Sequence, residues 1–409
     1  MNKLGHKVLL RRAQDYIEKY HPLLIGVAGR LNQTITKQAI SLVLSHDRAV
    51  HTMPTEFQGV GSVVSSLLGV NHKARSKSWW RLLIGSRVRE VAEPEPDTHI
   101  VELGPGVPGD MDTLATSFSF FVGVITGVPT HALELFVDKK IMAHELQSLI
   151  IQLPRQGYAI LNIDDPLVAA MAEKTVAHII TYGSSGAADV RLVRSKRVQQ
   201  GIAVEIEIDS KNYEIYLAHV TGKDQVLAAL AGLAVAKALQ IDIQKALQQL
   251  IKLEPEPGHL NFIPALNDAR ILDASYDATP EDMLSALEAL EELPARRKIS
   301  VLGLFNNLGN QTRFWNEQLA SKAGKISHGT ILVGDDIPEA RKAALAAGSD
   351  VHHFKTSIDA GKWLADYVHS GDLILVNGVA ELALEETVFR LLPENERNHV
   401  ALARKVKFA

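Results

Sequence analysis

Short apolar runs that alternate with helical segments constrain this chain more than any other feature of its sequence. The first run, at 23–29, leads through a glycine turn into a helical pattern at 36–45. Further apolar runs follow at 99–104, 120–126 and 158–164. This alternation is typical of a mostly parallel sheet with helices on its faces. The sequence therefore predicts an α/β fold.

The alternation pauses and then begins again, which predicts two domains behind a short N-terminal helix. Helical spacing of apolar residues ends before Pro22, so a helix is expected within 1–22. The segment 253–260, LEPEPGHL, has the prolines and the glycine of a domain junction. We therefore expect a P-loop-type central domain with a parallel sheet over 23–253. A second α/β domain, similar to a dinucleotide-binding fold, is expected over 254–409.

Charge and composition exclude several classes of protein. Lys and Arg number 43 against 47 Asp and Glu, giving a net charge of −4, so we expect no nucleic-acid partner. Because there is no cysteine, disulfides and thiolate chemistry are excluded. Neither a secretory signal nor an apolar stretch long enough to span a membrane is visible, and the expected location is cytoplasmic.

The segment 72–90 is the most basic part of the sequence. It contains six Lys or Arg residues together with Trp79 and Trp80. One interpretation is a surface that makes weak contact with anionic lipid or with a partner. The other is an ordinary packed helix whose basic side chains are solvated.

The segment 26–37, GVAGRLNQTITK, has the frame of a phosphate-binding loop between a strand and a helix. Such a loop needs small residues for backbone approach, a lysine for the outer phosphates and a hydroxyl for Mg²⁺. Gly29 and Thr34 fit that pattern, whereas Asn32 and Gln33 occupy the places of the glycine and the lysine. Taken alone, the loop is a weak signal for nucleotide binding.

The order of the segments that follow is more specific than any one of them. VELGPGVPGDMDTLA, VGVITGVPTHALELF, YAILNIDDP, GKDQVLAALAGLAVA, ILDASYDATPEDMLSAL and DLILVNG occur in that order. Together they resemble the Mur ligase family over about residues 23–400, and most closely its branch that adds D-alanyl-D-alanine to muramyl peptides. The resemblance implies that ATP phosphorylates a carboxylate, which an amine then attacks to form an amide. It also implies ATP and Mg²⁺ as cofactors.

Three positions keep the residue types of the family's metal site. Thr34 matches the Mg²⁺-binding hydroxyl, Glu102 the metal-binding glutamate and His131 the metal-coordinating histidine. Each also has a structural interpretation, because Thr34 can cap the following helix, and Glu102 and His131 can pair with each other or with backbone groups.

Other positions depart from the family in ways that remove charge. Gln33 replaces the lysine of the loop, for which Arg30 and Lys37 are the nearest basic residues. The family's carbamylated lysine aligns with Leu146, or alternatively with His144. These substitutions remove groups that would neutralise phosphate and hold the metal.

The family's nucleotide-contacting positions have also changed. Gln225 occupies one position of the His-Asn pair that the family has there. The motif that contains Asp273 and Tyr276 has lost one acidic residue and one asparagine relative to the family. His259 replaces the linker arginine, and Asn377 replaces a lysine. The glycines, prolines and apolar runs, by contrast, are retained, which is typical of a fold kept for its shape.

Two functional hypotheses follow. The first is a protein with the family's fold that has lost amide ligation and binds a protein partner or a ligand similar to a peptidoglycan precursor. The second is a divergent but active ATP-dependent ligase. Since only about 22 residues precede the loop, recognition of a UDP-linked substrate in the family's usual way is not expected.

Overall fold

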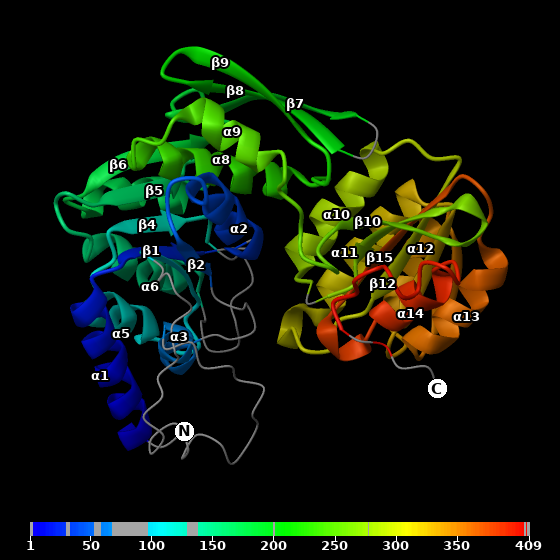
Figure 1. Ribbon diagram of the computed structural model, residues 1–409. Coiled ribbons are helices and arrows are strands. Elements are labelled where there is room, and N and C mark those ends of the chain that lie inside the picture. The colour runs from blue at the N-terminus through cyan, green and yellow to red at the C-terminus, as the bar shows by residue number, and fades with distance from the viewer. Residues whose placement is uncertain are drawn as a thin grey trace. The chain divides into compact units, whose positions relative to one another are not determined.

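The computed structural model describes residues 3–29, 33–52, 59–67, 97–128, 138–198, 201–276, 278–404 and 406. They form two compact units, each with its own sheet (Figure 1). The first contains Met1–Ser195, Ala203–Leu217 and Gln225–Leu253, and the second contains Lys196–Ile202, Ala218–Asp224 and Glu254–Ala409. The predicted α/β class is confirmed.

The first unit is built on a nine-stranded sheet in the order β2-β3-β1-β4-β5-β6-β7-β8-β9. Its strands are β1 (Leu23–Ala28), β2 (Val50–Thr52), β3 (Thr98–Leu103), β4 (Val122–Ile125), β5 (Tyr158–Asn162), β6 (His178–Gly183), β7 (Val190–Val198), β8 (Gly201–Ile208) and β9 (Lys211–Leu217). Its helices are α1 (Lys3–Tyr20), α2 (Gln33–Leu44), α3 (Val60–Leu67), α5 (Asp110–Ser117), α6 (Lys139–Ile151), α7 (Pro166–Ala169), α8 (Lys223–Ala238) and α9 (Ile243–Leu250).

The strands β2 to β6 pair in parallel around β1, the strand that leads into the glycine loop. β1 is almost entirely buried because helices cover both faces of the sheet, which explains its continuous apolar run. Val27 lies opposite Glu102 on one neighbour and Val124 on the other. The carboxyl ends of β1, β3 and β4 therefore meet at one edge of the sheet.

Each face of this sheet is covered by its own group of helices (Figure 1). α1, α3, α5 and α6 pack on one face in a single apolar cluster, while α2 and α8 pack closely on the other. A Cβ atom added to Gly232 of α8 would lie 3.1 Å from the backbone carbon of Ala39 of α2. The Ala- and Gly-rich sequence of α8 thus permits this close helix contact.

The N-terminal helix is part of the first unit. α1 buries Ala13 and Tyr16 against the core, and the Tyr16 hydroxyl lies 3.2 Å from Nε2 of the buried His99 of β3. Gln14 donates to the backbone oxygen of Ser117 at 3.2 Å. These contacts hold α1 against the core of the first unit, and the helix ends at Tyr20, shortly before Pro22.

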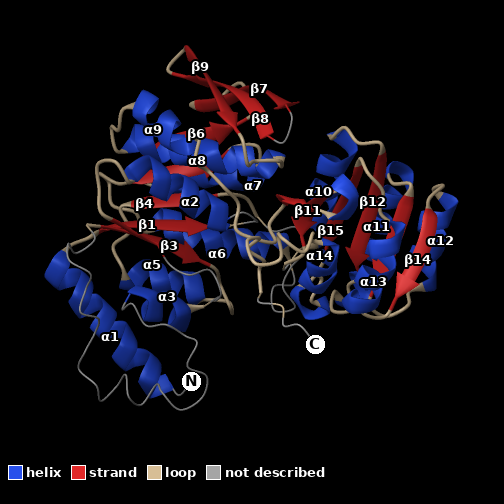
Figure 2. Cartoon of the chain, turned by 45° about the vertical axis from the view of Figure 1, so that its right-hand side comes forward, coloured by secondary structure: helices blue, strands red, loops and turns tan. Residues whose placement is uncertain are grey.

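The second unit has a six-stranded sheet in the order β10-β11-β15-β12-β13-β14, parallel except for the β10–β11 pair. Figure 2 labels β11, β15, β12 and β14 of this sheet. Its strands are β10 (Asn261–Pro264), β11 (Arg270–Ala274), β12 (Arg297–Gly303), β13 (Gly329–Val333), β14 (Asp350–Phe354) and β15 (Asp372–Asn377). Its helices are α10 (Pro280–Glu292), α11 (Thr312–Ile326), α12 (Pro338–Ala346), α13 (Ser357–Tyr367) and α14 (Glu385–Leu391).

Helices cover both faces of this sheet as well. α10, α11 and α12 share an apolar cluster on one face, and α13 and α14 share another on the opposite face. α10 begins with a reciprocal cap in which Thr279 and Asp282 bond each other's backbone N–H, with Pro280 in the first turn.

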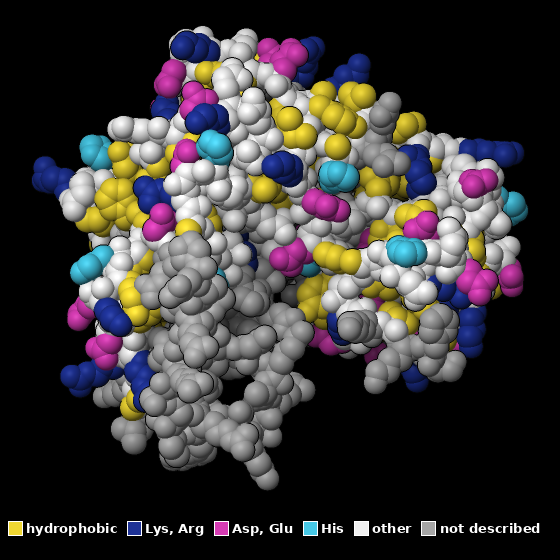
Figure 3. Space-filling view, in the orientation of Figure 1, with side chains coloured by type: hydrophobic (Ala, Val, Ile, Leu, Met, Phe, Trp, Pro, Cys, Tyr) yellow, Lys and Arg dark blue, Asp and Glu magenta, His cyan; other side chains and the backbone are white. Residues whose placement is uncertain are grey.

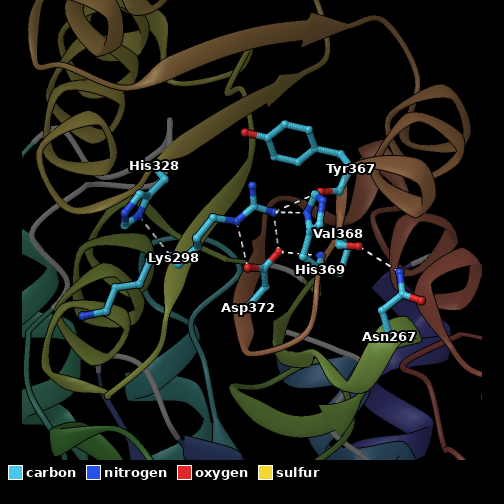
Figure 4. A network of polar contacts seen from close by, with 8 residues as sticks. Asn267, Lys298, His328, Tyr367, Val368, His369 and Asp372 are labelled. Atoms are coloured by element: carbon cyan, nitrogen blue, oxygen red, sulfur yellow. Dashed lines mark hydrogen bonds and ion pairs between the residues drawn. The ribbon is translucent and has the colours of Figure 1, made fainter.

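A network of polar contacts fastens the amino ends of β12 and β15 (Figure 4). Arg297 donates to both carboxylate oxygens of Asp372, at 2.9 and 2.6 Å, and also to the backbone oxygen of Tyr367. His369 receives a further bond from Arg297 at 2.8 Å. Because Asp372 is only 1% exposed, this bidentate pairing compensates for the desolvation of its charge.

The sequence did not predict the strand β7, whose residues VRLVRSKRV are rich in charge. Arg191 pairs with Glu207 at 3.4 Å and Arg194 with Glu205 at 3.5 Å, so charges on β7 are matched by those on β8. Such cross-strand pairs stabilise a strand whose apolar alternation is weak. The next two strands, β8 and β9, are neighbours in the sheet and are joined by a short turn.

Charges of both signs are interspersed over the described residues on the face drawn in Figure 3, in keeping with the net charge of −4. No helix in the described ranges is both long and apolar enough to cross a membrane. The basic segment at 72–90 lies outside the described residues, so both the surface-contact interpretation and the packed-helix interpretation stay predictions.

Candidate functional site

The candidate site begins at the turn between β1 and α2. Gly29 follows β1 with a φ of +125°, a conformation that L side chains rarely adopt. A Cβ atom at this position would come within 2.6 Å of the backbone oxygen of Gly127, so the turn requires glycine. The strand, the glycine turn and the helix that flank the predicted loop are therefore present. Asn32 and Arg30 lie outside the described residues.

Gln33, which is expected to align with the family's lysine, is the first residue of α2. Its side-chain nitrogen Nε2 donates to the backbone oxygen of Gly29 at 2.6 Å. The side chain thus folds back onto its own loop rather than extending beyond it. A neutral amide held in this way supplies no positive charge for a phosphate group.

Thr34 lies in the first turn of α2, where it is partly buried. One turn further on, Lys37 is only 2% exposed, and its Nζ lies 3.5 Å from Oε2 of Glu102. Glu102 is on β3, directly beside β1 in the sheet. The carboxylate expected to bind a metal is therefore paired with an ammonium of the same chain, and this pairing satisfies a lysine that would be costly to bury alone.

His131, the third residue of the expected metal site, lies outside the described residues. Within the described ranges, no group of three His, Cys, Asp or Glu side chains is placed to hold a metal ion. The ligation of Mg²⁺ by Thr34, Glu102 and His131 therefore stays a prediction.

A set of polar contacts that the sequence did not indicate ties the neighbouring loops together at this edge. Asn162, at the end of β5, donates to the backbone oxygen of Thr126 at 2.8 Å. Asp165 accepts from the backbone N–H of Val128 at 2.8 Å and also caps α7. A polar residue directly after an apolar strand is the signal that marks these positions, because side chains there lie at the carboxyl edge of the sheet.

The two candidates for the carbamylated-lysine position lie on α6 and differ in environment. Leu146 is 1% exposed and belongs to the apolar core of the first unit, whereas His144 is exposed. Between them, Glu145 accepts a hydrogen bond from the backbone N–H of Gly109 at 2.7 Å, which fixes the loop after β3. A leucine side chain cannot form a carbamate, and at this position its role is packing.

The residues expected to contact the nucleotide belong to both units. Gln225 lies in the first turn of α8, in the first unit, and is 3% exposed. Asp273 and Tyr276 belong to the second unit, at and just beyond the carboxyl end of β11. The ring of Tyr276 lies beside that of His259, with centroids 5.8 Å apart.

Asp273 has the most unusual electrostatic environment of these residues. It is fully buried, and its Oδ1 accepts from the backbone N–H of Ser275 at 3.0 Å. Burial raises the pKa of the Asp273 carboxyl from 3.8 to about 6, and the nearby Glu385 acts in the same direction. Ser275 and His259 oppose that rise in pKa. A carboxyl group that titrates near neutrality is a feature of functional sites, although structural networks also produce it.

Both units match protein families of known activity. Residues 34–236 match the Mur ligase middle domain, and 260–379 match the Mur ligase glutamate ligase domain. The UDP-N-acetylmuramoyl-tripeptide–D-alanyl-D-alanine ligase of Synechocystis is 26% identical over 385 residues, covering 94% of this chain and 77% of that protein. The Bacillus subtilis ligase of the same name is 23% identical, covering 94% of this chain and 79% of that protein.

Solved structures agree on the fold. The MurF ligase of Thermotoga maritima, determined in complex with ADP, superimposes with a TM-score of 0.78 at 20% identity and covers 94% of this chain and 82% of that one. The folylpolyglutamate synthase of Mycobacterium tuberculosis, complexed with ADP and AMPPCP, gives a TM-score of 0.66 at 16% identity, with coverages of 94% and 95%. The expected middle-domain and C-terminal-domain folds are thus confirmed.

Proposed function

This chain belongs to the Mur ligase family, in the lineage of the ligases that make peptidoglycan precursors, and we propose that it has lost most or all of the ATP-dependent ligation of that lineage. The observation that carries the proposal is the side chain of Gln33. It occupies the place of the loop lysine, and its amide is already bonded to the oxygen of Gly29 at 2.6 Å.

The missing charge has a large expected effect on ligation. A lysine at this position would place a full positive charge beside the outer phosphates, where negative charge must be stabilised during transfer. Loss of one preorganised donor of this kind costs roughly 3–4 kcal/mol, which is about 10²–10³ in rate. Gln33 offers only neutral donors, and its amide nitrogen is already bonded within the loop.

The described residues around the loop also fit ATP and Mg²⁺ poorly. The charge of Glu102 is balanced by Lys37 at 3.5 Å, which reduces its attraction for a divalent cation. Leu146 offers no amine that could be carbamylated to hold the metal. We therefore propose that the fold is retained to bind a protein partner or a ligand similar to a peptidoglycan precursor.

The decisive variant restores the missing groups. Asn32→Gly with Gln33→Lys returns the small residue and the charge to the loop, while Gln38→Lys adds the same charge on α2 outside it. We expect the double variant to gain Mg²⁺-dependent ATP binding in a calorimetric titration, and the Gln38→Lys control to resemble the wild type. Binding and ligation by the unmodified chain would contradict the proposal.

A second candidate is a divergent, active ligase that joins an amine to a carboxylate. The intact turn favours it, since Gly29 keeps its positive φ and Thr34 keeps its place at the start of α2. The relatives' names supply the substrates for the assay: a UDP-N-acetylmuramoyl-tripeptide and D-alanyl-D-alanine with ATP and Mg²⁺. Phosphate release that needs both substrates and disappears in Thr34→Ala would establish this alternative.

A further inference from the structure

A segment near the C-terminus lies over Tyr276, just beyond the carboxyl end of β11. Residues 400–404, called the strap below, follow α14 and its turns, and Val400 and Leu402 pack against the apolar cluster beneath α13 and α14. At its far end, the strap reaches the segment that holds Tyr276. These contacts lie entirely within the second unit.

Arg404 anchors the strap. Its Nη2 donates to Glu385 Oε2 at 2.9 Å and to the backbone oxygen of Ala380 at 2.6 Å, while its Nε pairs with the other oxygen of Glu385. The side chain of Glu385 is only 4% exposed, so Arg404 is the charge that balances it. Bidentate pairing of this kind is among the stronger polar contacts in proteins.

The same strap closes over Tyr276 and the glycine beside it. The Arg404 guanidinium carbon lies 5.6 Å from the centroid of the Tyr276 ring, within range of a cation–π contact. Gly258, with a φ of +82°, lies so close that an added Cβ atom would be 2.9 Å from Cβ of Ala403 and 2.8 Å from that of Tyr276. There is thus no space for a ligand between the strap and Gly258.

Two buried polar residues lie close to Tyr276 in the sequence, at and just beyond the end of β11. Asp273 and Ser275 are both fully buried, and among the described residues no third group is placed to bond Oδ2 of the first or Oγ of the second. Buried polar atoms in this state are rare and costly in folded proteins. They are the atoms that a polar ligand could satisfy once the cover has moved.

We propose that the strap is an autoinhibitory cover, which must lift before a ligand can reach Tyr276 and Asp273. Arg404 is its latch, and Glu385 is the receptor for that latch. The proposal does not depend on whether the chain retains ligase activity, because it concerns only access to the end of β11.

Nitration of the full-length protein by tetranitromethane, followed peptide by peptide, tests this cover. In Arg404→Ala we expect the rate at Tyr276 to rise roughly tenfold, the shift in opening expected from loss of a charge-assisted hydrogen bond. The matched control is Arg397→Ala, which removes another arginine of the tail, one that lies over Phe389 at 5.6 Å. The exposed Tyr216 serves as the internal reference rate.

An unchanged rate at Tyr276 in Arg404→Ala would overturn the proposal. A rise at Tyr276 and also at Tyr367, whose ring is stacked on Trp363, would mean that the unit had unfolded. In that event the nitration rate of Tyr276 is measured in Glu385→Gln, which weakens the pairing with Arg404 without removing the arginine. A faster rate at Tyr276 alone in that variant supports the cover, and a rate equal to the wild type refutes it.

Discussion

The buried carboxyl of Asp273 gives the sharpest quantitative prediction. Its pKa of about 6 in the folded chain lies about two units above the ordinary 3.8. At 1.36 kcal/mol per unit, ionised Asp273 costs the fold about 3 kcal/mol near neutral pH. Asp273→Asn removes that ionisation while keeping an oxygen that can accept from the backbone N–H of Ser275.

The sign of the pH dependence follows from proton binding. Between about pH 4 and about pH 6 the folded state holds the Asp273 proton more tightly than the unfolded state does. The contribution of Asp273 to stability is therefore most favourable below pH 4, falls as the pH rises through this window, and is constant above pH 6. The stability of Asp273→Asn relative to the wild type should accordingly rise by up to about 3 kcal/mol over the same window.

The assay is urea unfolding from about pH 4 to about pH 8, with the second unit followed by hydrogen exchange of the β11 and β15 amides. Reading one unit is necessary because a chain with two units need not unfold in a single step. The exposed Asp268→Asn in the same unit serves as the matched charge control. A stability difference between Asp273→Asn and the wild type that stays constant across the whole pH range would contradict a raised pKa at Asp273.

Three further predictions concern packing and charge pairs. Leu146→Ala should cost roughly 2–5 kcal/mol in urea unfolding, because it leaves a cavity in the core of the first unit. Breaking a fully buried ion pair costs roughly 3–5 kcal/mol, and Lys37→Met should destabilise the first unit by less than this because the side chain of Glu102 is 22% exposed. Adding Glu102→Gln to Lys37→Met should recover part of the lost stability. Arg297→Met should lower the unfolding free energy of the second unit by roughly 3–5 kcal/mol, because it leaves the buried carboxylate of Asp372 without its cation. A loss of stability under about 1 kcal/mol would contradict the role given to that network.

The sequence predicted the parts of the fold that depend on local pattern. The run at β1, the glycine turn and the start of α2 were visible because burial on both faces demands a continuous apolar strand, and the turn at Gly29 demands glycine. β7 was not visible, since its stability comes from charges on β8 rather than from its own alternation. The three-residue β2 is too short to show a pattern.

The candidate site was predicted only as positions, and its contacts depend on the fold. Lys37 and Glu102 are far apart in the sequence and meet only because β3 pairs with β1 in the parallel sheet. Likewise, the burial of Asp273 and the position of Arg404 over Tyr276 arise from packing within the second unit. Residue types alone cannot show such pairings, because they are set by strand order and by the path of the chain's end.

The proposed loss of nucleotide-dependent ligation can be tested by calorimetric titration of the unmodified chain with ATP in the presence of Mg²⁺. We expect no binding heat at millimolar nucleotide, because Gln33 is bonded to Gly29 and Glu102 is paired with Lys37. Micromolar binding that disappears when Mg²⁺ is chelated would contradict it and would place the chain among the working ligases of its family.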